Sequence, residues 1–171
     1  MRKVTTRELT LGAMVAALYV LLSYLSGLFG LAYGPVQFRF AEALCVLPFL
    51  FPTAVPGLAL GCLITNLLSP YGPLDVVFGT LATLLAALWT ARVPNRWLAP
   101  LPPVLCNAVI VGAVIAWAST DSAGAFRAAY VYNAGLLALE ELGACYVLGM
   151  LLLYTLPRIK FFQPMMRAGR L

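Results

Sequence analysis

The sequence contains no histidine and few charged residues, and each scarcity excludes a class of protein. Only 10% of its 171 residues are charged, whereas a soluble domain carries about a quarter. Without histidine no Ser/His or Cys/His catalytic arrangement can form, and we expect neither a metal site nor another cofactor. A phosphate-binding Gly-rich loop with a lysine is also missing, so we expect no ATP hydrolysis by that route and no enzyme. The cysteines form no CxxC pair, which predicts buried thiols.

Long uncharged stretches are what the sequence has instead. Asp, Glu, Lys and Arg are all missing from residues 9–38, 43–74 and 97–120. Each stretch is long enough for a helix to cross the hydrocarbon core of a bilayer, which needs about 20 apolar residues. Leu, Ala, Val and Ile form continuous runs instead of alternating with polar residues, which favours helices over a β-barrel. We therefore predict an all-α integral membrane protein.

Proline and glycine divide the chain into six expected transmembrane helices within a single membrane domain, residues 1–171. Their approximate ranges are 6–29, 39–51, 54–68, 74–91, 101–117 and 134–156. The alternative is one kinked helix from Arg39 to Leu68, which would give five spans. The basic start of the chain resembles a signal peptide, but the apolar run after it is too long, so we expect a retained first helix.

The positions of Lys and Arg favour six spans, because these residues accumulate on the cytoplasmic side of membrane proteins. With six spans and a cytoplasmic N-terminus, only Arg39 and Arg127 lie outside, and nine basic residues lie inside. With five spans, four lie inside and seven outside. The same distribution explains the net charge of +5 without nucleic acid. We predict six spans, with the N- and C-termini both cytoplasmic.

In this topology most carboxylates lie toward the outer face: Glu42, Asp75, Asp121, Glu140 and Glu141. Ionisable groups within a span cost about 2.5–3.5 kcal/mol each on insertion scales and are usually functional. Glu141 is the strongest candidate for a ligand site, about seven residues into the last expected helix. Glu140 points about 100° away around that helix. Either carboxylate could instead pair with Arg39 or Arg127 and merely hold helices together.

Other polar residues near the outer face could line a ligand cavity. Arg39 and Glu42 are three residues apart on one helical face, where they could line a cavity or simply form an ion pair. Asn66 and Tyr71 offer hydrogen bonds, and Tyr71 adds a ring for stacking. Asp75 could bind a ligand or cap its helix.

Small residues recur at a four-residue spacing on the first expected helix, as Gly12 with Ala16 and Ala13 with Ala17. Such a face suits tight packing against another helix, including one of a partner protein. For Asn107 we also expect helix packing, and the expected outer loop 119–133 has no assigned role.

Five segments resemble the QueT family: Gln37–Pro48, Gly61–Asp75, Phe78–Ala87, Leu98–Asn107 and Glu141–Gly149. Members of this family are substrate-binding membrane subunits (S components) of ATP-driven energy-coupling factor (ECF) transporters, and they are assigned to queuosine precursors. The resemblance extends over nearly the whole chain.

The resemblance implies an S-component-like bundle of six helices in the bilayer of a prokaryotic plasma membrane. It would capture a 7-deazaguanine, such as queuine or its 7-cyano and 7-aminomethyl precursors, from outside. A transmembrane coupling protein (T protein) and two cytoplasmic ATPases would supply the work. The coupling protein would dock on an Ala-x-x-x-Ala face, here Ala13 and Ala17. The family pattern has one carboxylate four residues before a Cys-Tyr pair, and Glu141 occupies that position. Glu140 is an additional carboxylate that departs from the family pattern.

A guanine-like edge presents an N–H and an amino group side by side, and one carboxylate can accept both. We expect Glu141 to have this role. Candidate donors to the ring carbonyl are Gln37, Arg39 and Asn66; candidate stacking rings are Tyr71, Phe38 and Phe40; candidate second carboxylates for a cationic aminomethyl group are Glu42, Asp75 and Glu140. The alternatives are an S component for another vitamin or nucleobase and a stand-alone secondary carrier, although such carriers commonly show inverted repeats that we do not find.

Overall fold

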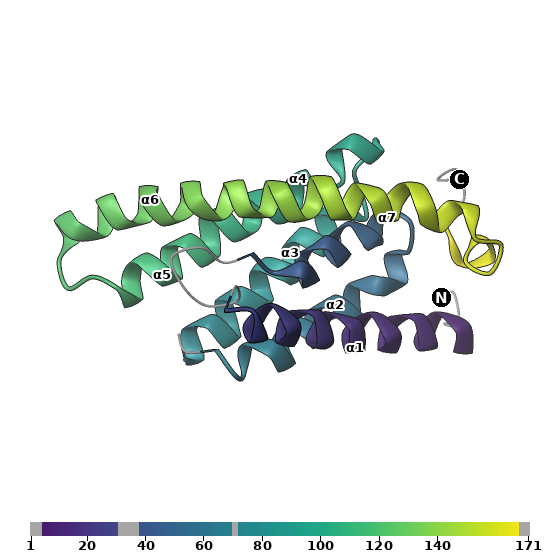
Figure 1. Ribbon diagram of the computed structural model, residues 1–171, viewed down its shortest axis with the longest axis horizontal. Coiled ribbons are helices and arrows are strands. Elements are labelled where there is room, and N and C mark those ends of the chain that lie inside the picture. Colours follow the sequence, from purple (N-terminus) through teal and green to yellow (C-terminus); the bar gives the residue numbers. More distant parts are fainter. Residues whose placement is uncertain (1–4, 31–37, 70–71, 168–171) are drawn as a thin grey trace.

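The computed structural model describes residues 5–30, 38–69 and 72–167, and this part of the chain is helical with connecting turns (Figure 1). In chain order the elements are α1 (Thr6–Leu28), η1 (Phe40–Phe49), η2 (Pro52–Ala54), α2 (Val55–Asn66), η3 (Asp75–Gly79), α3 (Thr80–Thr90), η4 (Arg96–Leu98), α4 (Leu101–Cys106), η5 (Asn107–Val111), α5 (Gly112–Ala118), α6 (Ala123–Leu142), η6 (Gly143–Gly149), α7 (Met150–Thr155), η7 (Leu156–Arg158) and η8 (Gln163–Met165). The elements η3, η5 and η6 are π-helical, and the other η elements are 3₁₀ helices.

Within the described residues, three helical stretches are long and apolar enough to cross a membrane: Thr6–Leu28, Arg96–Ala118 and Ala123–Arg158. Shorter apolar helices cover Phe40–Phe49 and Asp75–Thr90. The prediction of an all-helical chain with the apolar helices of a membrane protein is confirmed. Six crossings, and the side of the membrane on which the ends lie, stay predictions.

The segments η1 and α2 run in opposite directions and are not one kinked helix. Near the end of α1, the Phe40 N–H donates to Ser26 Oγ at 3.0 Å. Near the start of α1, Gly12 packs against Thr53 and Gly57. The chain of η1 therefore returns along α1 and reverses direction before α2. The 3₁₀ geometry suits this short segment, because a rise of about 2 Å per residue carries it further than an α-helix would.

Glycines bring α2 against the backbone of α1. A Cβ atom on Gly57 would lie 2.2 Å from the Gly12 carbonyl oxygen, and one on Gly61 would lie 2.8 Å from Tyr19 Cβ. No larger residue fits at either position. This packing divides the small-residue face predicted on the first helix. Gly12 and Ala16 are buried toward α2, whereas Ala13 and Ala17 remain exposed.

The last helix is longer than predicted, since it begins at Ala123 and not at 134. Ser122 precedes it, and its side chain accepts a hydrogen bond from the Ala125 N–H at 3.3 Å. The alanine-rich segment that follows has high helix propensity, so the expected loop 119–133 shrinks to a short turn. Glu141 consequently lies 18 residues (141 − 123) from the helix start, about 27 Å along the axis, instead of about seven residues as predicted. The continuous helix to Arg158 has 36 residues.

The two described ends of the chain meet at one end of the bundle, as Figure 1 shows for the start of α1 and the segment after α7. Thr5 and Glu8 share a groove with Pro164 and Met165. Arg167 anchors the C-terminal segment there, because its backbone N–H donates to Leu50 O at 2.8 Å and its guanidinium to Ala91 O at 2.7 Å.

Candidate functional site

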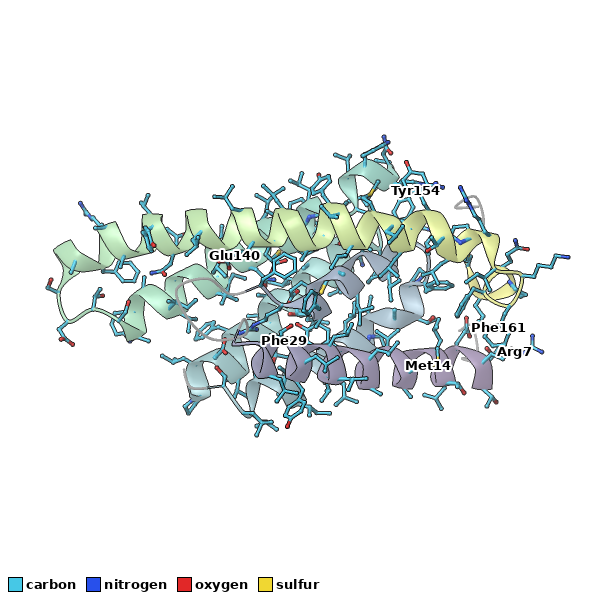
Figure 2. All side chains as sticks on the ribbon, in the orientation of Figure 1. Arg7, Met14, Phe29, Glu140, Tyr154 and Phe161 are labelled. Atoms are coloured by element: carbon cyan, nitrogen blue, oxygen red, sulfur yellow. The ribbon has the colours of Figure 1, made fainter. Side chains whose placement is uncertain are left out.

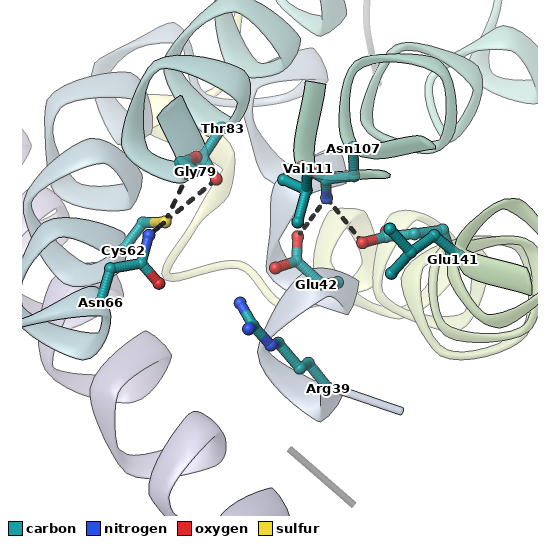
Figure 3. A pocket seen from close by; sticks show the side chains of 10 residues that line it. Arg39, Glu42, Cys62, Asn66, Gly79, Thr83, Asn107, Val111 and Glu141 are labelled. Atoms are coloured by element: carbon teal, nitrogen blue, oxygen red, sulfur yellow. Dashed lines mark hydrogen bonds between the residues drawn. The ribbon is translucent and has the colours of Figure 1, made fainter. Parts of the chain in front are cut away.

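A small polar cavity lies inside the bundle, enclosed by segments that are distant in the sequence (Figure 3). Its lining residues are Arg39, Glu42, Cys62, Asn66, Gly79, Thr83, Asn107, Val111, Leu137 and Glu141. The free volume is about 20 Å³, which is room for one water molecule. A bicyclic ligand could enter only if the surrounding side chains moved apart.

Asn107 joins two carboxylates on one side of the cavity. Its Nδ2 atom donates to Glu141 Oε1 at 2.6 Å and to Glu42 Oε2 at 3.4 Å. The three side chains are only 4–6% exposed. Burying carboxylates is costly unless hydrogen-bond donors or positive charge compensate for the lost water. This cluster is therefore an unusual feature of an otherwise apolar bundle.

Glu42 is held more tightly than Glu141. Tyr19 donates its hydroxyl hydrogen to Glu42 Oε1 at 2.6 Å, and the Cys45 thiol donates to Oε2 at 3.2 Å. With Asn107, Glu42 accepts three hydrogen bonds among those found. Glu141 accepts from Asn107 and, at 3.5 Å, from the Cys145 thiol. Because a carboxylate has about four acceptor sites, Glu141 has more capacity left for a ligand.

The positive charge of the cavity comes from Arg39. Figure 3 shows its guanidinium directed into the cavity, between Glu42 on one side and Asn66 on the other. In the 3₁₀ helix η1, residues three apart lie above one another, which places Glu42 and Cys45 along one face, and Arg39 is the extended residue directly before this helix. Among the described lining residues Arg39 is the only base, facing two carboxylates.

A second network, on the other side of the cavity, positions Asn66. Its Nδ2 atom donates to the Asp75 backbone oxygen at 3.2 Å and to Cys62 Sγ at 3.3 Å. Thr83 donates to the same sulfur at 3.1 Å, and the Cys62 thiol donates to Gly79 O. Gly79 has no space for a side chain, since a Cβ there would lie 2.7 Å from Asn66 Nδ2.

Irregular helical turns supply several of these residues. The π segments η3 and η5 carry Gly79 and Asn107, and η6 begins two residues after Glu141 and carries Cys145. A π turn contains an extra residue and shifts the helix face that follows it, and such turns are frequent at functional sites. Three of them at the level of one cavity mark this region as the candidate site.

Four of the predicted ligand residues line the cavity: Glu141, Arg39, Glu42 and Asn66. Two others among the described residues, Asp75 and Glu140, do not line it. The Asp75 carboxylate accepts a hydrogen bond from Ser69 Oγ, and Asp75 lies within the first turn of its helix, not at its cap. Glu140 lies beside Glu141 on α6 but outside the lining. Arg127, proposed as a partner of these carboxylates, is exposed near the start of α6.

Of the predicted stacking rings, Phe38 and Phe40 do not line the cavity. Phe38 and Phe40 pack edge to face with centroids 5.4 Å apart, and Phe38 lies against Gly143. Tyr71 and Gln37 lie outside the described residues. Val111 and Leu137 supply apolar walls instead.

Four further residues belong to the site but were not predicted from the sequence: Tyr19, Cys62, Thr83 and Asn107. Asn107 could have been predicted as a site residue from the sequence, since a buried amide in a membrane helix is rare. Hydroxyl and thiol groups give no such signal, because they can also bond to their own helix.

Comparison with known proteins places the chain in a family. A family model described as the QueT transporter matches residues 9–158. The chain belongs to the QueT transporter family. The matched range covers every residue that lines the cavity.

One relative is the protein named queuosine precursor transporter QueT from Lactococcus lactis subsp. cremoris (strain MG1363). It is 40% identical over 84 residues, which span 49% of each chain. No solved structure matches the sequence. Family membership therefore rests on sequence, and the geometry of the site comes from the present structure alone.

Proposed function

We propose that the chain is the substrate-binding subunit of an ATP-driven ECF importer and captures a queuosine precursor from outside the cell. The observation that carries this proposal is the buried Glu42–Asn107–Glu141 cluster, which faces a polar cavity inside an apolar bundle. The family and the name of the lactococcal relative support a 7-deazaguanine as the ligand.

Glu141 accepts the guanine-like edge of the ligand in this proposal. Its remaining acceptor capacity suits the adjacent N–H and amino groups, and a bidentate, charge-assisted pair is stronger than a neutral hydrogen bond. Arg39 donates to the ring carbonyl. Val111 and Leu137, which line the cavity, contact the faces of the bicycle.

The charges of the cavity favour a cationic ligand. Two carboxylates face one guanidinium, so an ionised pair leaves a negative excess that a 7-aminomethyl group would neutralise. Glu42 is the second carboxylate that supplies negative charge to the cavity, since Asp75 and Glu140 do not line it.

We further propose that the chain crosses the membrane six times, with both ends in the cytoplasm. Arg7 lies at the end of the bundle where the described chain ends meet (Figure 2), and Arg158, Lys160 and Arg167 belong to the segment after α7 at the same end. This agrees with the preference of basic residues for the cytoplasmic side. A coupling protein and two ATPases would be separate chains.

Binding by the purified protein tests the proposal directly. We expect titration calorimetry to show that the wild-type protein binds one or more of queuine, the 7-cyano base and the 7-aminomethyl base more tightly than guanine or unrelated vitamins. Glu141→Gln should weaken that binding by about ten- to hundredfold, because it replaces a charged acceptor with an amide. Glu140→Gln is the matched control on the next residue and should bind like the wild type.

Two results would contradict the proposal. One is a wild-type protein that binds none of the 7-deazaguanines, and the other is a Glu141→Gln variant that is folded and binds as tightly as the wild type. Uptake into liposomes by the purified chain, without ATPase subunits, would identify a secondary carrier instead.

A further inference from the structure

Asn66 has a buried oxygen atom with no hydrogen-bond partner among residues 5–30, 38–69 and 72–167. The residue is 1% exposed and lines the cavity, and the unpartnered atom is its Oδ1. Buried polar atoms without partners are few in native proteins, and each calls for an explanation. Figure 3 shows this oxygen turned toward the cavity, on the side opposite Glu141.

The orientation of the Asn66 amide follows from its neighbours. Both amide hydrogens have acceptors, namely the Asp75 backbone oxygen and Cys62 Sγ. The sulfur can accept because its own hydrogen is directed to Gly79 O. A rotated amide would bring Oδ1 against the Asp75 oxygen, and two acceptors would then face each other. The network thus presents the oxygen to the cavity, and not the NH₂ group.

We propose that Asn66 Oδ1 accepts a hydrogen bond from an N–H group at the five-membered-ring end of the bound ligand. This inference rests on the proposed function, and it reverses the role that we expected from the sequence, in which Asn66 donates to the ring carbonyl. That donor role belongs to Arg39, whose guanidinium has only hydrogens to offer.

The positions of the Glu141 carboxylate and of Asn66 Oδ1 determine which end of the ligand Asn66 contacts. In a 7-deazaguanine, the edge that suits Glu141 lies on the six-membered ring. The N–H of the five-membered ring and the 7-aminomethyl group lie at the opposite end. Asn66, across the cavity from Glu141, meets one of these two donors.

A hydrogen bond from the ring N–H to Asn66 would make the site specific for free bases. In a nucleoside the ring nitrogen carries ribose and no longer has a hydrogen. A site built to bond a particular N–H rejects an analogue that lacks it, because its buried acceptor then stays unsatisfied. The site therefore selects free bases over nucleosides if the ring N–H is the donor.

The experiment compares two ligands that differ in one atom. The first is 7-deazaguanine, and the second is its analogue with oxygen in place of the N–H of the five-membered ring. We expect the wild-type protein to bind the oxygen analogue about ten- to hundredfold more weakly. In Asn66→Leu this ratio should fall below about threefold, because the variant has no acceptor to lose. Thr65→Val, one residue earlier on α2 and outside the cavity lining, should keep the wild-type ratio.

A third ligand distinguishes the two donors. If the wild type discriminates against the oxygen analogue, the ring N–H is the donor. If it does not, but a 7-aminomethyl group on the oxygen analogue tightens binding to the wild type and not to Asn66→Leu, the ammonium is the donor.

The inference is overturned if the wild type binds all three ligands equally, or if Asn66→Leu keeps the wild-type preferences. If Asn66→Leu does not fold, equal binding of all three ligands by the wild type still overturns the inference. Failure of every 7-deazaguanine to bind the wild type would instead overturn the proposed function.

Discussion

At the scale of single residues, Asn107 links the two halves of the carboxylate cluster. One amide nitrogen serves Glu42 on η1 and Glu141 on α6, so it ties two distant parts of the chain and compensates in part for burying two acids. A buried donor in this position affects both stability and ligand binding, because the same two carboxylates face the cavity.

Replacing Asn107 with leucine should therefore destabilise the protein and weaken binding together. Loss of a donor to buried charged acceptors costs about 1–3 kcal/mol or more. We expect a lower melting temperature in detergent and an affinity for the 7-deazaguanine reduced about tenfold or more. Asn133→Leu on α6 is the control, since its amide only donates to Ala129 O of its own helix. A normal melting temperature for Asn107→Leu would show that the bridge is unimportant.

The charged residues of the site could be predicted from the sequence, but their partners could not. Glu141, Glu42 and Arg39 stand out because charge inside a membrane is expensive. The sequence does not show which charges meet, since their contacts join residues from different helices. The free atom of Asn66 is also invisible in the sequence, because its amide could equally donate or accept.

At the scale of helical elements, the regular spans could be predicted and the irregular turns could not. The apolar runs identify the helices, and proline marks their ends. A π turn depends on how one helix packs against its neighbours, so the residues of η3, η5 and η6 do not by themselves predict a π turn. The predicted start of the last helix, at residue 134, was also wrong, because α6 begins at Ala123. Arg127 and Asn133 are polar residues typical of a loop, although the alanines around them favour a helix.

Gly79 connects the π turn η3 to the Asn66 network, and Gly79→Ala tests this connection. The new methyl group would lie 2.7 Å from Asn66 Nδ2 and 2.8 Å from Asp75 Oδ1, so the Asn66 amide must shift. We expect the affinity for the ligand to fall about tenfold, as after loss of one hydrogen bond. The measurement is calorimetry on the purified variant.

Gly135→Ala is the matched control, because a Cβ at this position in α6 meets nothing within 4 Å. Alanine is the better helix former, and this variant should gain stability of about 0.4–1 kcal/mol with unchanged affinity. Equal affinity for Gly79→Ala and the wild type would mean that the Asn66 amide can shift without consequence for the ligand.

At the scale of the whole molecule, the ligand site and the surface of α1 are separate. The cavity residues come from η1, α2, η3, α3, η5 and α6, whereas α1 contributes only Tyr19 through its contact with Glu42. Beside α1, an apolar groove is lined by Ala13, Ala17 and Leu21 from α1 and by Leu60 and Ile64 from α2. The exposed part of the predicted small-residue face thus lies in this groove.

If the proposed coupling protein docks in this groove, filling it should prevent assembly without disturbing the ligand site. The double change Ala13→Leu and Ala17→Leu adds bulk where small residues allow close helix approach. Neither position lines the cavity, so we expect ligand affinity within about twofold of the wild type and loss of co-purification with the coupling protein and ATPases. Ala128→Leu, an exposed position on α6, should leave the complex intact. Assembly that survives the double change would place the docking surface elsewhere, whereas loss of both assembly and ligand binding would show that α1 and the cavity are not independent.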